Sequence, residues 1–239
     1  MARTKIVATL GPASWSEASI AALIRAGVDV FRLNFSHGSP EEHQAAIQTI
    51  RRLKAQKGQP IAILGDLPGR KIRLGNLAPS PLTLDRGDGF VLASRKMTGG
   101  VSGATVRYPT LSRDVGKGNE IALGDGAVLL RVKAKSDNHL ECVVERGGEI
   151  TSGAGVHFPG ARLSVKGLTG ADRLWTKFAA EQKIDWLAVS FVRTSREIRS
   201  VRRILGRNDC EIPVIAKIEN REAVDNLGSI VREADGAMV

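Results

Sequence analysis

The sequence predicts an α/β protein: a (β/α)8 barrel of parallel strands, truncated after about six strands, with a smaller β domain inserted into it. Apolar strand-like runs alternate with helical runs near both ends of the chain, which is typical of parallel sheets. Between them lies a Gly-rich stretch of short alternating runs, which is typical of a small antiparallel β domain. Polar residues follow successive strands. This favours a barrel, whose strand ends serve one site, over an open doubly wound sheet, the second architecture that fits.

Three strands and two helices are expected before the inserted domain. Ser16 is a candidate N-cap, and Ser39-Pro40-Glu41-Glu42 is a capping box with Pro at the first helical position. The third strand is nearly all apolar, so we expect it to be buried on both faces. The expected strands are 4–10, 28–35 and 60–66, with helices at 16–26 and from 40 to about 57.

The inserted domain is expected to cover residues 68–165, which leaves 1–67 and 166–239 for the barrel domain. Gly-Asp pairs and a Gly-Gly pair divide the insert into pieces, such as the alternating run at 127–133. Because it follows the third strand, the insert would close over the strand ends as a lid. Beyond it we expect helices at 169–182, 195–205 and 221–233, and strands at 186–192, 213–217 and from 236.

Composition and charge exclude several classes of protein. The two cysteines match no metal-ligand spacing and no disulfide framework. The chain shows no signal-peptide core and no apolar run near the roughly 20 residues that span a bilayer, so we expect a cytoplasmic protein without a membrane partner. The net charge of +10 raises nucleic acid as a partner, but the cations are scattered and aromatic residues are only 4%, too few for base stacking. A solvated basic face, or attraction for small phosphorylated anions, is the better interpretation, and no nucleic-acid partner is expected.

The run Val30-Phe-Arg-Leu-Asn-Phe-Ser-His-Gly38 is the most informative part of the chain. Side chains alternate faces along a strand, so Arg32, Asn34 and Ser36 should point the same way. A guanidinium beside two neutral oxygen ligands suits an anion that lies next to a hard cation, as a phosphate does next to a metal ion. A solvated strand end that leads into a turn explains these residues equally well.

Charged groups follow two further strands. A carboxylate, a Gly turn and three cations fall within residues 66–73, which suits polyphosphate beside a metal. Lys217 and Glu219 lie two residues apart at the end of an apolar strand, and therefore on one face. Burying both is costly unless they pair or bind a ligand. They form either a salt bridge at the barrel mouth, or a metal-binding Glu beside a Lys that neutralises charge on a reacting group.

These motifs resemble those of the pyruvate kinase family, and they occur in the family's order from end to end of the chain. Two more motifs, in the inserted stretch, look like the family's mobile B domain, a small antiparallel β-barrel. The matching segments are 4–14, 32–38, 66–73, 124–126, 155–160, 190–193 and 217–220.

The resemblance implies a barrel that transfers the phosphoryl group of phosphoenolpyruvate to ADP, giving pyruvate and ATP in glycolysis. By position, Arg32 would hold the phosphate, and Lys217 would stabilise the transferring phosphoryl group and the enolate. Glu219 would bind Mg²⁺ or Mn²⁺. The family is homo-oligomeric. A relative that binds a phosphate ligand without catalysis is the alternative that the sequence leaves open.

The resemblance also assigns a monovalent-cation site and nucleotide contacts. Asn34, Ser36 and Asp66 match the family's K⁺ ligands, and Asn34, His37 and Arg73 match residues that bind ADP or ATP. The remaining histidines are expected on the surface or in packing; they are His43, His139 and His157.

The chain departs from the family's motifs at three places. Lys71 and Leu67 stand where potassium-dependent members carry an acidic residue and a Thr; the Lys71 ammonium can replace the cation, so we predict that K⁺ is not required. Ala154 stands where the family usually has a Lys that helps to bind ATP, which predicts weaker nucleotide binding or lid closure. The match stops at Val239, before the family's second Mg²⁺-binding carboxylate, so we expect little kinase activity from this polypeptide alone.

Overall fold

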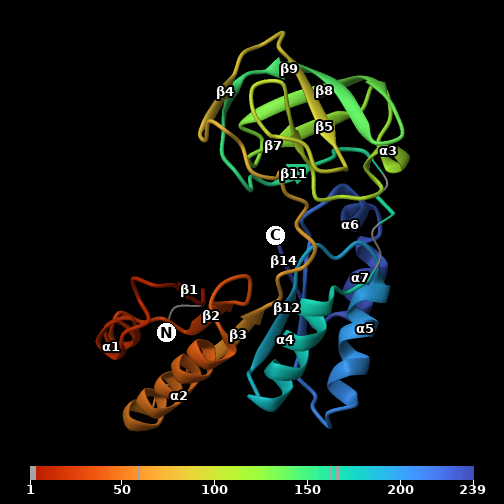
Figure 1. The fold of residues 1–239 in the computed structure, drawn as a ribbon. Coiled ribbons are helices and arrows are strands. Elements are labelled where there is room, and N and C mark those ends of the chain that lie inside the picture. Colours follow the sequence, from red (N-terminus) through yellow and green to blue (C-terminus); the bar gives the residue numbers. More distant parts are fainter. Residues whose placement is uncertain (1–3, 59, 162, 165–166) are drawn as a thin grey trace. The chain divides into compact units, whose positions relative to one another are not determined.

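The structure, a computed structural model, describes residues 4–58, 60–161, 163–164 and 167–239. The chain folds into two compact units (Figure 1). The first combines Met1–Arg70 with Gly167–Val239 and contains a parallel sheet with helices. The second, Lys71–Lys166, is built mainly from β-strands. None of the described helices is both long and apolar enough to cross a membrane.

Six parallel strands form the sheet of the first unit, and their order in space is their order in the chain. The α/β class that the sequence predicts is therefore confirmed. A doubly wound sheet reverses its strand order at a switch point, and the described strands show no such reversal. The result is a half-barrel sheet with β1 and β14 as its outer strands. The strands are β1 (Val7–Leu10), β2 (Val30–Asn34), β3 (Ala62–Asp66), β12 (Trp186–Val189), β13 (Val214–Lys217) and β14 (Gly236–Met238).

Helices follow the strands of this sheet, and side-chain caps define several of their first turns. The Ser16 hydroxyl accepts the Ser19 N–H, and the capping box between Ser39 and Glu42 has both of its hydrogen bonds, as predicted. Thr169 and Thr194 begin two further capping boxes that the sequence analysis did not single out. The helices are α1 (Glu17–Arg25), α2 (Pro40–Lys57), α4 (Gly170–Glu181), α5 (Ser195–Gly206), α6 (Arg221–Asp225) and α7 (Leu227–Glu233).

Three of the expected elements are wrong in extent, and the first of them, the strand expected at 4–10, begins only at Val7. The strand expected at 186–192 ends at Val189, because Phe191 adopts a left-handed backbone with φ of 54° that no strand can continue through. The single helix expected at 221–233 is divided at Asn226. The Asn226 side-chain amide donates to the backbone carbonyls of Arg193 and Glu222, and such local bonds compete with the helical pattern.

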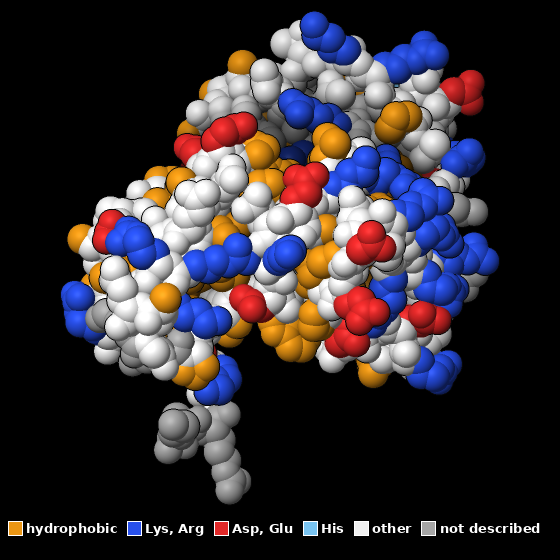
Figure 2. All heavy atoms as spheres, turned by 90° about the horizontal axis from the view of Figure 1, so that it is seen from below, with side chains coloured by type: hydrophobic (Ala, Val, Ile, Leu, Met, Phe, Trp, Pro, Cys, Tyr) orange, Lys and Arg blue, Asp and Glu red, His pale blue; other side chains and the backbone are white. Residues whose placement is uncertain are grey.

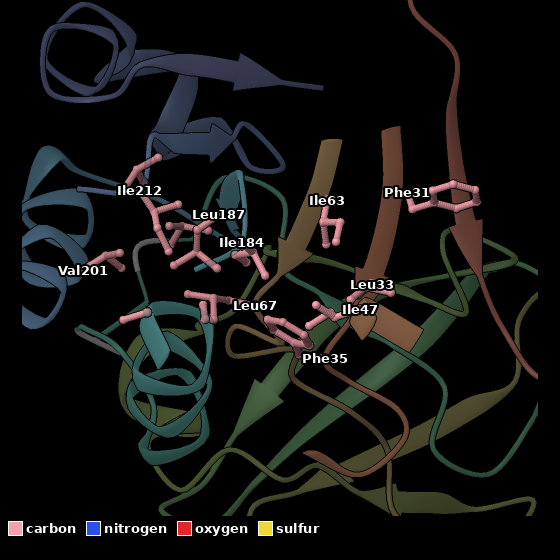
Figure 3. Packing of buried hydrophobic residues seen from close by; sticks show 14 of the residues in the cluster. Phe31, Leu33, Phe35, Ile47, Ile63, Leu67, Ile184, Leu187, Val201 and Ile212 are labelled. Carbon is pink, nitrogen blue, oxygen red and sulfur yellow. The ribbon is translucent and has the colours of Figure 1, made fainter. Parts of the chain in front are cut away.

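The core of the first unit lies between the sheet and its helices. Ile63 and Leu64 point to opposite faces of β3 and are each 2% exposed, so this strand is buried on both faces, as predicted. Figure 3 shows part of the helix-facing cluster, where strand residues lie beside Ile47 of α2 and Val201 of α5. Burying a side chain of this size contributes about 1.5–3 kcal/mol, so this layer is the main source of stability for the half-barrel.

A buried histidine ties the end of β2 to α2. His43 is 1% exposed, and its Nε2 lies 2.8 Å from the carbonyl oxygen of His37. Its ring packs against Trp15, Phe35 and Trp175, which confirms the expected packing role. Burial in this aromatic surrounding lowers the pKa of His43, because the charged imidazolium loses its hydration there.

The second unit is a mainly antiparallel β structure with its own core, which includes Leu74, Phe90 and Leu130. Its six-stranded sheet has the order β11-β7-β8-β9-β5-β6, and β4 pairs with β10 separately. These pairings do not show closure, so the expected small β-barrel stays a prediction. The elements are β4 (Leu82–Leu84), β5 (Gly89–Ala93), β6 (Gly103–Thr105), α3 (Leu111–Asp114), β7 (Glu120–Leu123), β8 (Val128–Lys135), β9 (His139–Arg146), β10 (Gly148–Ile150) and β11 (Val156–His157).

One strand pair in the second unit departs from the expected antiparallel arrangement. β5 and β6 run parallel, because the chain between them folds back before β6 begins and Gly100 bridges to Gly103. A Cβ on Gly103 would lie 2.4 Å from the carbonyl oxygen of Val91, so only glycine allows the two strands to approach this closely.

Basic side chains gather at one side of the face shown in Figure 2, with acidic side chains among them. On α5, part of the positive charge is neutralised within the first unit. Arg199 pairs with Glu233 at 2.7 Å and Arg202 pairs with Asp235 at 2.8 Å. These exposed pairs contribute little to stability individually.

We predict that His43 makes the first unit sensitive to mild acid. The unfolded chain takes up the His43 proton near pH 6.5, whereas the folded chain does so only at lower pH, because its pKa is lowered. Between these pKa values the unfolded state binds more protons, so the free energy of unfolding falls as the pH drops through about 6.5. His43→Phe should reduce this acid loss, while at pH 8 it costs about 1 kcal/mol from the lost hydrogen bond to His37.

Urea unfolding at pH 8 and pH 5.5 tests this, with tryptophan fluorescence as the readout. All three tryptophans, Trp15, Trp175 and Trp186, lie in the first unit and report on it alone. His37→Gln, which changes an exposed imidazole in the same loop, is the matched control and should keep the wild-type acid loss. Equal acid losses in His43→Phe and the wild type would contradict the prediction.

Candidate functional site

A buried carboxylate lies at the C-terminal end of β3 and holds two cations. Asp66 is 1% exposed, and its Oδ2 accepts hydrogen bonds from Arg32 Nε at 2.9 Å and from Lys217 Nζ at 3.2 Å. Its Oδ1 accepts the Ser190 hydroxyl at 3.1 Å. A buried carboxylate is tolerated only when it is paired and hydrogen-bonded, and Asp66 is both.

The parallel register brings these residues together from four strands. Asn34, at the end of β2, is the Cα partner of Asp66, and Ala188 of β12 is its partner on the other side. Ser190 follows β12 directly, and Lys217 is the last residue of β13. Because parallel strands end at the same edge of a sheet, residues far apart in the sequence meet at the C-terminal edge of this one.

The Lys217 ammonium makes three contacts, one for each of its N–H donors. Besides Asp66, it reaches the Ser190 hydroxyl oxygen at 2.9 Å and Glu219 Oε1 at 3.2 Å. Only 13% of its side chain is exposed, so its position is restrained by burial as well as by hydrogen bonds. The second oxygen of Glu219 accepts the backbone N–H of Phe191 at 2.8 Å. The salt bridge that the sequence suggested for Lys217 and Glu219 is therefore present.

Arg32 is the more accessible of the two cations, with 27% of its side chain exposed. Its Nη1 donates to the Thr9 hydroxyl at 2.9 Å, while Nε and Nη2 both face Asp66. Two cations and two carboxylates give the cluster of Arg32, Lys217, Asp66 and Glu219 a balanced formal charge. An anion that arrives at this edge meets a guanidinium and an ammonium already held in place, which favours its binding.

The other residues predicted on β2 lie beyond this cluster. Asn34 Oδ1 accepts the backbone N–H of Ser36 at 3.0 Å, so the amide closes a local turn. The side chains of Ser36 and His37 are exposed. Among the described residues, neither Asn34 nor Ser36 hydrogen-bonds to the Asp66 carboxylate. Their assignment to a monovalent-cation site, and that of Asn34 and His37 to nucleotide contacts, stays a prediction.

Lys71 and Arg73 lie in the second unit, where they line a polar hollow of about 400 Å³. Lys71 Nζ lies 3.6 Å from Asp125, and Arg73 Nη1 donates to the carbonyl oxygen of Gly153 at 3.0 Å. Ala154, which replaces the lysine expected from the resemblance, also lines this hollow. The predicted roles of these residues toward the first unit stay predictions. Leu67, by contrast, is buried in the core of the first unit.

The donor set has limited capacity for a metal ion. The described residues contain no group of three or more His, Cys, Asp or Glu side chains that could hold one. Glu219, 29% of whose side chain is exposed, is the accessible carboxylate of the cluster. Mg²⁺ is commonly held by one or two carboxylates together with water and substrate oxygens, so Glu219 fits such an ion as part of a shared site.

Two side chains that contact this cluster, Ser190 and Thr9, were not among the predicted site residues. Ser190 belongs to a polar strand end that the sequence did reveal, but its contacts to Asp66 and Lys217 depend on the fold. Thr9 lies on β1 directly opposite Arg32 in the parallel register, and alternation along β1 would have placed it on the same face.

The fold and the cluster define an α/β protein with a half-barrel sheet and a cluster of charged side chains at its C-terminal strand ends. The family model "Pyruvate kinase, barrel domain" matches residues 1–239, and the chain belongs to the pyruvate kinase family.

Curated relatives agree with this assignment. A pyruvate kinase of Thermococcus litoralis is 40% identical over 237 residues, covering 99% of this chain and 50% of the relative. A pyruvate kinase of Staphylococcus aureus strain USA300 is 39% identical over 241 aligned residues, covering 100% of this chain and 41% of the relative. The chain thus spans about half the length of these relatives.

We predict that loss of the Asp66 charge destabilises the first unit strongly. Asp66→Asn keeps the shape but leaves Arg32 and Lys217 without their shared counter-ion. Removing one partner of a buried ion pair costs about 3–5 kcal/mol, and the partial exposure of Arg32 places the expected loss near the lower end. Urea unfolding followed by tryptophan fluorescence measures it.

The matched control is Asp225→Asn, which removes a carboxylate from an exposed pair with Arg221 on α6. Such a pair contributes less than about 1 kcal/mol, so the control should stay close to wild type. Similar losses for both variants would show that Asp66 does not organise the cluster.

Proposed function

We propose that this chain supplies the phosphoenolpyruvate-binding part of a pyruvate kinase, which transfers a phosphoryl group from phosphoenolpyruvate to ADP to give pyruvate and ATP. The observation that carries the proposal is the convergence of Arg32 and Lys217 on the buried Asp66. Family membership supports it, because the resemblance of the segments around Arg32 and Lys217 places both cations in the family's motifs. Phosphoryl transfer depends on positioning and charge neutralisation, and this cluster offers both.

The architecture that accompanies this function is a (β/α)8 barrel with a lid. In this proposal the half-barrel sheet is the part of such a barrel that runs from β1 to β14. The unit at 71–166 is the lid, the small β domain expected at 68–165. The strand order supports the barrel, because each strand lies beside its predecessor without reversal.

Each charged residue of the cluster has a proposed role. Arg32, the more exposed cation, binds the phosphate of phosphoenolpyruvate in a fork-like contact. Lys217 neutralises charge on the transferring phosphoryl group and on the enolate left behind. Asp66 keeps both cations at a fixed spacing. Glu219 would hold Mg²⁺ or Mn²⁺, which supplies further neutralisation of phosphate charge when bound.

The nucleotide is proposed to contact Arg73, Asn34 and His37. The hollow beside Arg73 is lined by two cations and by the carboxylates of Asp125 and Glu149, so Arg73 is the proposed phosphate contact there, while Lys71 lies 3.6 Å from Asp125. Ala154 removes a third cation from this hollow, so we expect weaker nucleotide binding than in relatives that carry a lysine there. A cytoplasmic location and a homo-oligomeric assembly remain expectations from the sequence and from the resemblance.

We predict that the chain binds phosphoenolpyruvate in the presence of Mg²⁺, and that Arg32→Gln and Lys217→Gln each weaken binding at least tenfold. Each variant removes one charge-assisted contact to the ligand, and a tenfold change corresponds to about 1.4 kcal/mol. Isothermal titration calorimetry measures the affinities. Arg196→Gln, an exposed arginine of α5, is the matched control and should bind like the wild type.

A lack of binding by the wild type would refute the proposed function. A coupled assay of pyruvate production, run on the same samples, distinguishes a catalytic chain from a relative that binds a phosphate ligand without catalysis. Turnover supports a catalytic chain, whereas binding without turnover supports a phosphate-ligand-binding relative.

We also predict that K⁺ is dispensable. The Lys71 ammonium is proposed to take the place of the monovalent cation, so phosphoenolpyruvate affinity should be equal in Na⁺ and K⁺ buffers. Lys71→Glu restores the acidic residue of potassium-dependent relatives and should make binding several-fold tighter in K⁺ than in Na⁺. Lys177→Glu makes the same charge change on an exposed position of α4 and should show no preference. Strong K⁺ stimulation of the wild type would contradict the prediction.

A further inference from the structure

The hydroxyl of Ser190 connects the central carboxylate to the central ammonium. It donates to Asp66 Oδ1 at 3.1 Å and accepts from Lys217 Nζ at 2.9 Å, and the residue is only 9% exposed. A hydroxyl has one donor and two acceptor positions, so it can bridge a carboxylate and an ammonium without adding charge. Ser190 is therefore the neutral link between the two charged groups.

The turn that carries Ser190 is held in an uncommon conformation. Phe191 has a φ of 54°, which is rare for a bulky residue and persists only where its surroundings enforce it. Gly69 lies against this turn: a Cβ on Gly69 would come within 2.8 Å of both Ser190 Cβ and Phe191 Cδ2. Gly69 is fixed in turn, because its N–H donates to Asp172 at 2.8 Å.

Two successive residues of this turn contact two different charged groups of the cluster. The Ser190 side chain contacts Lys217, and the Phe191 backbone N–H donates to Glu219 Oε2 at 2.8 Å. Lys217 and Glu219 are themselves 3.2 Å apart. The geometry of a single turn thus sets where the ammonium lies relative to the accessible carboxylate.

We propose that Ser190 is a positioning residue for Lys217, and this inference rests on the proposed role of Lys217 in binding the transferring phosphoryl group. Ser190 fixes the direction of one N–H of the ammonium, while Asp66 and Glu219 fix the other two. Without the hydroxyl, the ammonium keeps its two carboxylate contacts but loses the third, so the position of its charge relative to an approaching phosphoryl group is less restrained.

The first test needs no ligand. In a ¹H–¹⁵N spectrum of the lysine ammonium groups, Lys217 should give a slowly exchanging signal, assigned by its loss in Lys217→Gln. Ser190→Ala should speed its exchange and remove the signal, whereas Ser190→Thr keeps the hydroxyl and should retain it. Ser200→Ala removes an exposed hydroxyl on α5 that donates to Arg196, and it should leave the signal unchanged.

Two further measurements separate positioning from folding and from function. Tryptophan fluorescence in urea should show that Ser190→Ala is folded and unfolds at nearly the same urea concentration as the wild type. If Ser190 only stabilised the fold, the unfolding midpoint would fall. Calorimetry with phosphoenolpyruvate should show a three- to tenfold loss of affinity in Ser190→Ala and a smaller loss in Ser190→Thr.

The outcomes distinguish the two proposals. If the wild type binds phosphoenolpyruvate and Ser190→Ala changes neither ammonium exchange nor affinity, the role of Ser190 is overturned and the proposed function stands. If Ser190→Ala releases the ammonium but the wild type does not bind phosphoenolpyruvate, the contact is supported and the proposed function fails.

Discussion

The central constraint in the first unit is the burial of the Asp66 carboxylate between two cations. An unpaired buried charge would be prohibitively costly, so Arg32 and Lys217 must both reach Asp66 for this sheet to form with that residue in place. The same requirement constrains the ends of their strands, because a shift in register of either strand would move one of the two cations away from the carboxylate. The contact that stabilises this edge of the sheet is therefore also the one that assembles the proposed phosphate-binding cluster.

The remaining geometry follows from a sheet whose strands lie in chain order. Each strand ends beside its predecessor, so the segments that follow β1, β2, β3, β12 and β13 meet at one edge. Helix caps and the core between sheet and helices position these ends, and the buried His43 anchors the loop after β2 to α2. The second unit has a separate core and its own polar hollow, which both basic and acidic side chains line.

Most elements of the first unit could be predicted because their signals are local. Alternation along β2, the apolar run of β3 and the capping box at Ser39 are all short-range patterns. The errors arose where a side chain or backbone responded to a distant partner. Asn226 divides the last helix partly by bonding to Arg193, and the turn at Phe191 ends β12 early beside Glu219. The parallel pairing of β5 with β6 depends on a close approach at Gly103 that no periodicity reveals.

The sequence by itself determined the family and the α/β class, and it singled out Arg32, Asp66, Lys217 and Glu219 as candidate site residues. These inferences rest on local motifs and on the order of the motifs along the chain. The tertiary structure alone decided how these residues contact one another. It showed that one carboxylate is shared by both cations, that Ser190 and Thr9 hold those cations, and that a backbone amide contacts Glu219. Those contacts span up to 151 positions in the sequence, and only the register of neighbouring strands brings them within hydrogen-bonding distance.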